Sequence, residues 1–261
     1  MAARRITSLD PDPLDIPRSH PRAVLTHQYT ENDMTVTPNT LFRATGVAAA
    51  VAGLIFIGVQ IGSPHLDGTT ITTTNAVVRD SLKVLMAALA LAGISGMYLL
   101  QVRKMGVAGL VGYLVFVTGY LTMLGIEFVG AFVLPSIAHS SPAYVSNAIA
   151  EATNGTVTGS IGLIKVAILV NGITYVAGGF IFGIALFRAN VLARWAAILL
   201  ACGSVATIAT GVMPQYERLF AFPTGVALIG LGYSVWQAQR APADRSITSA
   251  VSSQLEPAGA R

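Results

Sequence analysis

The sequence predicts an all-α fold, a polytopic transmembrane bundle of about six helices. Composition is the first reason, because 53% of the residues are hydrophobic, only 11% are charged and the mean hydropathy is +0.65. An average soluble domain is less apolar and has about 25% charged residues. The second reason is that six apolar stretches each come close to the ~20 residues that cross a bilayer as a helix. The third is that the basic residues gather at the ends of those stretches.

The apolar stretches define six predicted spans, at 45–62, 82–100, 106–134, 162–187, 191–213 and 218–237. Short connections join the second span to the third, the fourth to the fifth and the fifth to the sixth, which predicts antiparallel hairpins. Asp80 and Ser81 are expected to cap the N-terminus of the second span. In the longer loop after the third span, residues 144–152 predict a short interfacial helix.

Outside the spans, the chain ends are polar. Residues 1–43 contain Pro11, Pro13, Pro17, Pro21 and Pro38 and show no helical period. Such a segment has no apolar face to bury, which predicts a disordered N-terminal tail. We expect residues 44–238 to form one transmembrane domain and residues 239–261 to form a second disordered tail.

The Lys and Arg residues predict the orientation of the spans, since cytoplasmic loops of membrane proteins are rich in both. If both termini are cytoplasmic, twelve of the 16 Lys and Arg residues lie inside, and only Arg79, Lys83, Lys165 and Arg218 lie outside. We therefore expect a multi-pass protein of the cell membrane with two cytoplasmic tails. The net charge of +4 follows from this distribution, and the absence of a basic stripe argues against nucleic-acid binding.

Small residues recur at the spacing that brings helices close together. Packing within the bundle is the favoured interpretation, because close backbone approach drives helix association in lipid. The alternative is a face for a homo-oligomer or for a membrane-protein partner. The positions are Ala88, Ala92 and Gly96; Gly109 and Gly112; Gly179 and Gly183; and Gly230 and Gly232.

Catalytic and metal-binding patterns are mostly missing from the sequence. Gly93-Ile94-Ser95-Gly96 matches the short serine motif of rhomboid-type proteases, but that chemistry needs a histidine base near the serine. All four histidines lie in the N-terminal tail or in predicted outer loops, at His20, His27, His65 and His139. We therefore interpret the serine motif as helix packing and expect no enzyme, no cofactor and no metal site.

Four polar residues at membrane depth form the candidate site: Gln60, Glu127, Lys165 and Asn171. An ionisable group within a span is costly and suggests function. Glu127 and Lys165 are expected at similar depth near the outer boundary and have opposite charges. One interpretation is an interfacial ion pair between the third and fourth spans. The other is an outward-facing polar pocket, with Gln60 and Asn171 lining its deeper part.

The last two spans carry a resemblance to known sequences. The pattern runs from Phe180 through Phe187, Arg188, Arg194 and Trp195 to Gly203, followed by Pro223 and Gly230-Leu-Gly232-Tyr233. It resembles bacterial six-span integral membrane proteins of unknown function. The resemblance implies a bacterial inner-membrane location and brings no catalytic residues with it.

Two classes of function fit these observations. The favoured one is a non-catalytic accessory, regulatory or assembly component that acts through helix contacts. The alternative is a small transporter or receptor for a modest polar ligand that enters from outside. Transporters usually place polar groups and broken helices at the bilayer midplane, and this sequence shows few polar groups there.

Overall fold

The computed structural model describes residues 37–61, 70–153, 155–211, 213 and 217–240, which belong to one compact unit. Those residues form an all-α helical bundle without strands, as the sequence predicts. Both predicted tails lie almost entirely outside the described residues, so their disorder stays a prediction.

Helix α1 spans Pro38–Gly58 and begins seven residues before the predicted span. Its start follows from local chemistry: the Thr37 side chain accepts a hydrogen bond from the backbone N–H of Thr40, and Pro38 occupies the first turn. Proline is favoured there because its missing N–H would have no helical partner. The helix therefore starts at a capping signal rather than at the edge of the apolar run.

Helix α2, Thr74–Phe128, folds back on itself at Gly106, whose φ of 59° and ψ of −164° are not helical. We call residues 74–105 its first arm and residues 107–128 its second arm. The hydroxyls of Ser95 and Tyr113 are 3.1 Å apart across the two arms. The predicted hairpin is thereby confirmed. The predicted cap at Asp80 and Ser81 is wrong, because Thr73 caps the helix and accepts from the backbone N–H of Ala76.

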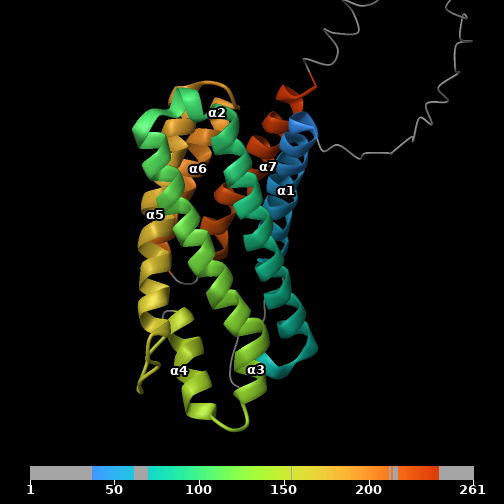
Figure 1. Cartoon of the computed structure of the whole chain (residues 1–261). Helices are drawn as coiled ribbons and strands as arrows, with labels where there is room; N and C mark the ends of the chain where they lie inside the picture. The colour runs from blue at the N-terminus through green and yellow to red at the C-terminus, as the bar shows by residue number, and fades with distance from the viewer. Residues whose placement is uncertain (1–36, 62–69, 154, 212, 214–216, 241–261) are drawn as a thin grey trace, which may run out of the picture. The chain divides into compact units, whose positions relative to one another are not determined.

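Beyond the second arm, the chain forms a small apolar cluster at the end of the bundle opposite Gly106 (Figure 1). The arm continues through a π-helical turn, Val129–Val133, into α3, Leu134–Ile137. Helix α4, Pro142–Ala152, follows and confirms the predicted short helix in this loop. Asn147 on α4 then accepts hydrogen bonds from the backbone N–H groups of Thr158 and Gly159, which guides the chain back to the bundle.

The last three helices close the bundle into a ring. They are α5, Ile164–Ala189; α6, Arg194–Ala206, which continues as the 3-10 helix η3, Thr207–Gly211; and α7, Glu217–Ala238. Each helical segment packs on its neighbours, in the order α1, first arm, second arm, α5, α6, α7 and back to α1.

Four of the described helices are long and apolar enough to cross a membrane: Pro38–Gly58, Thr74–Ile137, Ile164–Ala189 and Leu219–Ala238. The second of them includes both arms of α2. The apolar helix Arg194–Ala209 is shorter. By length and composition these helices could cross a membrane, while the membrane location and the exact number of spans stay predictions.

Glycines let the helices of the ring approach closely. A Cβ on Gly96 would lie 2.0 Å from the Thr45 hydroxyl on α1, and one on Gly112 would lie 2.7 Å from the Phe182 backbone on α5. Gly179 packs in the same way on Ser204 of α6. These glycines pack inside the bundle, which is the interpretation that the sequence favoured, whereas Ala88 and Ala92, grouped with Gly96 in the sequence, are exposed. Gly93 contacts Ala49, so the serine motif also lies at a helix interface.

Candidate functional site

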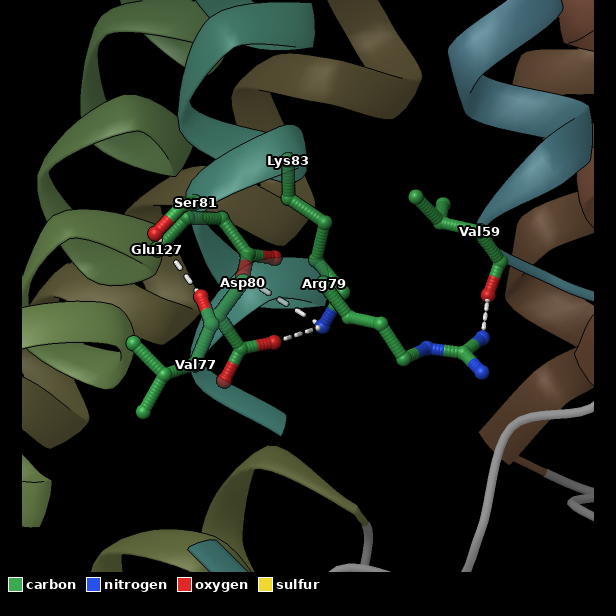
Figure 2. A network of polar contacts seen from close by, with 7 residues as sticks. All are labelled: Val59, Val77, Arg79, Asp80, Ser81, Lys83 and Glu127. Atoms are coloured by element: carbon green, nitrogen blue, oxygen red, sulfur yellow. Dashed lines mark hydrogen bonds and ion pairs between the residues drawn. The ribbon is translucent and has the colours of Figure 1, made fainter. Parts of the chain in front are cut away.

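An ion-pair network joins the two arms of α2 (Figure 2). The Lys83 ammonium lies 2.8 Å from an Asp80 carboxylate oxygen and 3.4 Å from a Glu127 carboxylate oxygen. Asp80 and Lys83 are on the first arm, one helical turn apart, and Glu127 is on the second. Two carboxylates therefore share one ammonium.

Neighbouring polar contacts hold this end of the first arm in place. The Arg79 guanidinium donates to the backbone carbonyl of Val59, the C-cap residue of α1, and the Ser81 hydroxyl donates to the Val77 carbonyl (Figure 2). Arg79 thereby ties the end of α1 to the start of α2. The network and this tether stabilise the same end of three helical segments.

The expected ion pair between Glu127 and Lys165 does not form. Glu127 pairs with Lys83, whereas the Lys165 ammonium lies 3.9 Å from a Glu151 carboxylate oxygen of α4. The Lys165 side chain is 66% exposed, compared with 23% for that of Glu127. The physical reason is that the first arm begins at Thr74, before Lys83. Lys83 therefore lies within the helix hairpin, opposite Glu127 on the second arm.

Gln60 lies in the turn after α1, where its backbone N–H donates to the Ile57 carbonyl. It does not line the cavity described next. Of the four residues that the sequence singled out, only Asn171 does. The four residues therefore do not converge on this cavity.

A cavity of about 680 Å³ lies in the half of the bundle nearer to α3 and α4. Four elements line it: α1 with Phe56, α2 with Met123, α5 with residues 171–173 and 175–177, and η3 with Thr207 and Ile208. Its walls are mostly apolar, and the described residues that line it include no Asp, Glu, Lys or Arg. The volume is in the range of small-molecule sites, roughly 300–1,000 Å³.

Two residues of the cavity wall, Asn171 and Tyr175, have polar atoms that are themselves buried and do not face its open space. The Tyr175 hydroxyl interacts with Thr224 and Tyr120. The Asn171 side-chain oxygen has no hydrogen-bond partner among the described residues. Leaving a buried polar group unpaired costs about 1–3 kcal/mol.

Behind Tyr175, two more hydroxyls are buried, those of Tyr120 on the second arm of α2 and Thr224 on α7. Both interact with the Tyr175 hydroxyl. The Tyr120 and Tyr175 rings lie 5.7 Å apart between centroids, in the bundle core. Three helices therefore bring hydroxyl groups together in the core.

Sequence reasoning missed Tyr120, Tyr175 and Thr224 as site residues. The available signal was their position within apolar spans, where a hydroxyl needs a partner. Tyrosine and threonine are common in helices, so that signal alone does not separate a site from ordinary packing. Their convergence depends on how three helices are rotated.

The described lining of the cavity is mostly apolar, with Asn171, Tyr175 and Thr207 as its residues with amide or hydroxyl groups. Elsewhere too, the described residues include no group of three or more His, Cys, Asp or Glu side chains that could hold a metal ion.

Comparisons of the chain with protein-family models, with curated proteins and with solved structures found no significant match.

Proposed function

We propose that this protein is a membrane receptor or small transporter that binds a small molecule in the cavity beside Asn171. The observation that carries the proposal is a cavity of about 680 Å³ with mostly apolar walls and Asn171 among its lining residues. Binding sites of this kind combine apolar walls with a few polar groups that orient the ligand. The proposal revises the polar pocket expected from the sequence, because the walls are mainly apolar.

The accessory role that the sequence favoured would use small-residue faces to contact a partner helix. The described Gly96, Gly112, Gly179 and Gly183 already contact other helices of this chain, and only Ala88 and Ala92 of the set that includes Gly96 are exposed. The cavity, in contrast, is an open space of about 680 Å³ with Asn171 in its wall. We therefore favour the ligand-binding role.

We also propose that the Gly106 end of the bundle faces the cytoplasm of a bacterial cell. Figure 1 shows the start of α1, the α2 turn, the connection between α5 and α6 and the end of α7 at this end, and each of these carries exposed basic residues. They are Arg43, Arg103, Lys104, Arg188, Arg194 and Arg240. Cytoplasmic membrane faces are enriched in such residues. The start of α1 and the C-terminal end of α7 both lie at this end.

The experiment fills the cavity and looks for loss of a bound molecule. The protein is extracted from its native membrane in mild detergent and examined by native mass spectrometry. Gly172 lines the cavity, and a Cβ at this position meets nothing within 4 Å, so Gly172→Leu can enter the open space without a clash. We expect wild-type protein to retain a small-molecule adduct that Gly172→Leu loses.

The matched control is Gly125→Leu, because a Cβ on Gly125 also meets nothing within 4 Å and Gly125 lies outside the cavity wall. This variant should retain the adduct. Both variants should keep the thermal stability of the wild type, which separates loss of binding from loss of folding. Equal adduct levels in the two variants, or no adduct in any of the proteins, would contradict the proposed function.

A further inference from the structure

We infer that an anionic phospholipid binds along the seam between α6 and α7, with its charged head group at the level of Arg194 and Arg240. The seam consists of Arg194 and Trp195 at the start of α6, and of Tyr233, Trp236 and Arg240 at the end of α7. None of these residues lines the cavity. The inference therefore goes beyond the proposed function and concerns a second binding surface.

Two contacts bring the start of α6 and the end of α7 together. The backbone N–H of Ala193, directly before α6, donates to the Ser234 hydroxyl of α7 at 3.0 Å. The Trp195 ring packs on α7 at Gly230, where a Cβ would clash with it. The indole therefore lies beside the last turns of α7, and the two helix ends form one surface.

The cations of the seam have no carboxylate partner among the described residues. Arg194 and Arg240 are both exposed and belong to none of the ion pairs of the described chain. Three of its four acidic residues pair with Lys83 or Lys165. The fourth, Glu217, begins α7, roughly 35 Å along the helix from Arg240. No described carboxylate therefore competes with an external anion for the two guanidinium groups.

Aromatic rings hold both guanidinium groups in place. The Arg194 Cζ lies 4.1 Å from the centroid of the Phe187 ring, and the Arg240 Cζ lies 3.6 Å from that of Trp236. A guanidinium over a ring still has N–H donors, whose fork matches the oxygen atoms of a phosphate. A zwitterionic lipid with a choline group fits less well, because the two cations repel choline and already cover these rings. The seam therefore selects a phospholipid with a net negative charge.

The order of side chains along the seam matches the order of groups in a phospholipid. Trp195 and Tyr233 are 57% and 58% exposed, and such rings prefer the level of the lipid head groups. Tyr233 precedes Arg240 by two turns, or roughly 10 Å along the helix. Further from the helix ends, the helical period places Ile198 below Trp195 and Val226 below Tyr233, and both are exposed. Cation, ring and aliphatic side chain thus follow one another as phosphate, glycerol and acyl chain do.

The test compares two phospholipids that differ in the charge of the head group. Purified protein in mild detergent receives equal amounts of phosphatidylglycerol and phosphatidylcholine with the same acyl chains, and native mass spectrometry counts the lipids that stay bound. We expect the wild type to retain phosphatidylglycerol about tenfold more than phosphatidylcholine, as one or two charge-assisted hydrogen bonds allow. An excess of glycerol phosphate should not displace the lipid, because the acyl chains also contribute to binding.

Removal of the two cations should abolish this preference. The double variant Arg194→Gln, Arg240→Gln should retain the two lipids at about equal levels. The matched control, Arg103→Gln with Lys104→Gln, removes the same charge from exposed positions beside the α2 turn, outside the seam. It should keep the preference, as should Gly172→Leu, which fills the cavity. All of these variants should keep the thermal stability of the wild type, which separates loss of binding from loss of folding.

Equal losses of preference in the two double variants would overturn the seam as a site, because the general charge of this end would then attract the lipid. Equal retention of both lipids by the wild type would overturn the anionic phospholipid. Displacement by glycerol phosphate would also overturn it, since a phosphate group alone would then suffice. Loss of the preference in Gly172→Leu would place the lipid in the cavity and contradict the seam.

Discussion

The Lys83 ammonium lies 3.4 Å from the Glu127 carboxylate, across the two arms of one folded helix. The two residues are at similar sequence distances before and after Gly106, so an antiparallel hairpin brings them to the same depth. Lys83 also contacts Asp80 at 2.8 Å. Because the ammonium is shared, its removal leaves two partly buried carboxylates without a partner.

We predict that Lys83→Met destabilises the protein more than Glu127→Gln, since Asp80 still pairs with Lys83 in the second variant. The loss for Lys83→Met should be about 1–3 kcal/mol, between the values for exposed and buried pairs. Free energies of unfolding measured in detergent micelles test this. The double mutant should lose less than the sum of the single losses.

The control for this cycle is Lys165→Met, because the Lys165 side chain is 66% exposed and its partner is Glu151. Its effect should stay within about 0.5 kcal/mol and should add to that of Glu127→Gln. Coupling between Lys165 and Glu127, or additivity between Lys83 and Glu127, would be incompatible with the observed pairing.

Gly106→Ala should destabilise the hairpin although the added methyl group has room. A Cβ on Gly106 meets nothing within 4 Å, but its φ of 59° and ψ of −164° lie in a region reached almost only by glycine. We expect a loss of about 1–3 kcal/mol in the free energy of unfolding. Gly125→Ala, also in open space but helical, should be neutral or slightly stabilising. Equal effects would show that the turn does not depend on glycine.

Gly178→Ala should separate two helices of the ring. A Cβ on Gly178 would lie 2.4 Å from the backbone nitrogen of Phe116, which cannot move without shifting the second arm of α2. Overpacking of this kind costs about 1–3 kcal/mol. Gly172→Ala, on the same helix but facing open space, should leave thermal stability unchanged or slightly higher. If both variants melted at the same temperature, close α2–α5 packing would not matter for stability.

The proposed orientation predicts which cysteines react with an impermeant thiol reagent in intact cells. In a Cys202→Ala background, Ser146→Cys on α4 should react, and Lys104→Cys beside the α2 turn should react only after permeabilisation. Both positions are exposed. Gln101, which also lies near the turn, is only 2% exposed and is therefore unsuitable as a site for cysteine labelling. The opposite labelling pattern would reverse the orientation.

Local chemistry was readable from the sequence alone. Apolar runs with few charges predict membrane helices because every buried backbone group must find its partner within its own segment. The short connection around Gly106 likewise predicted the α2 hairpin, and Pro142 marks the start of α4. Helix boundaries were less accurate, since Thr37 and Thr73 begin helices several residues before the apolar runs.

Side-chain partners were decided by the tertiary structure. The sequence identified Glu127 and Asn171 as polar groups at membrane depth. That assignment needs only the composition of one helix and the position of the residue along it. It paired Glu127 with Lys165 instead of Lys83, because a partner depends on the register between two helices. It also missed Tyr175 and the buried hydroxyls of Tyr120 and Thr224. Each of these lies on a different helix, so only the rotation and packing of whole helices could bring their hydroxyls together in the core.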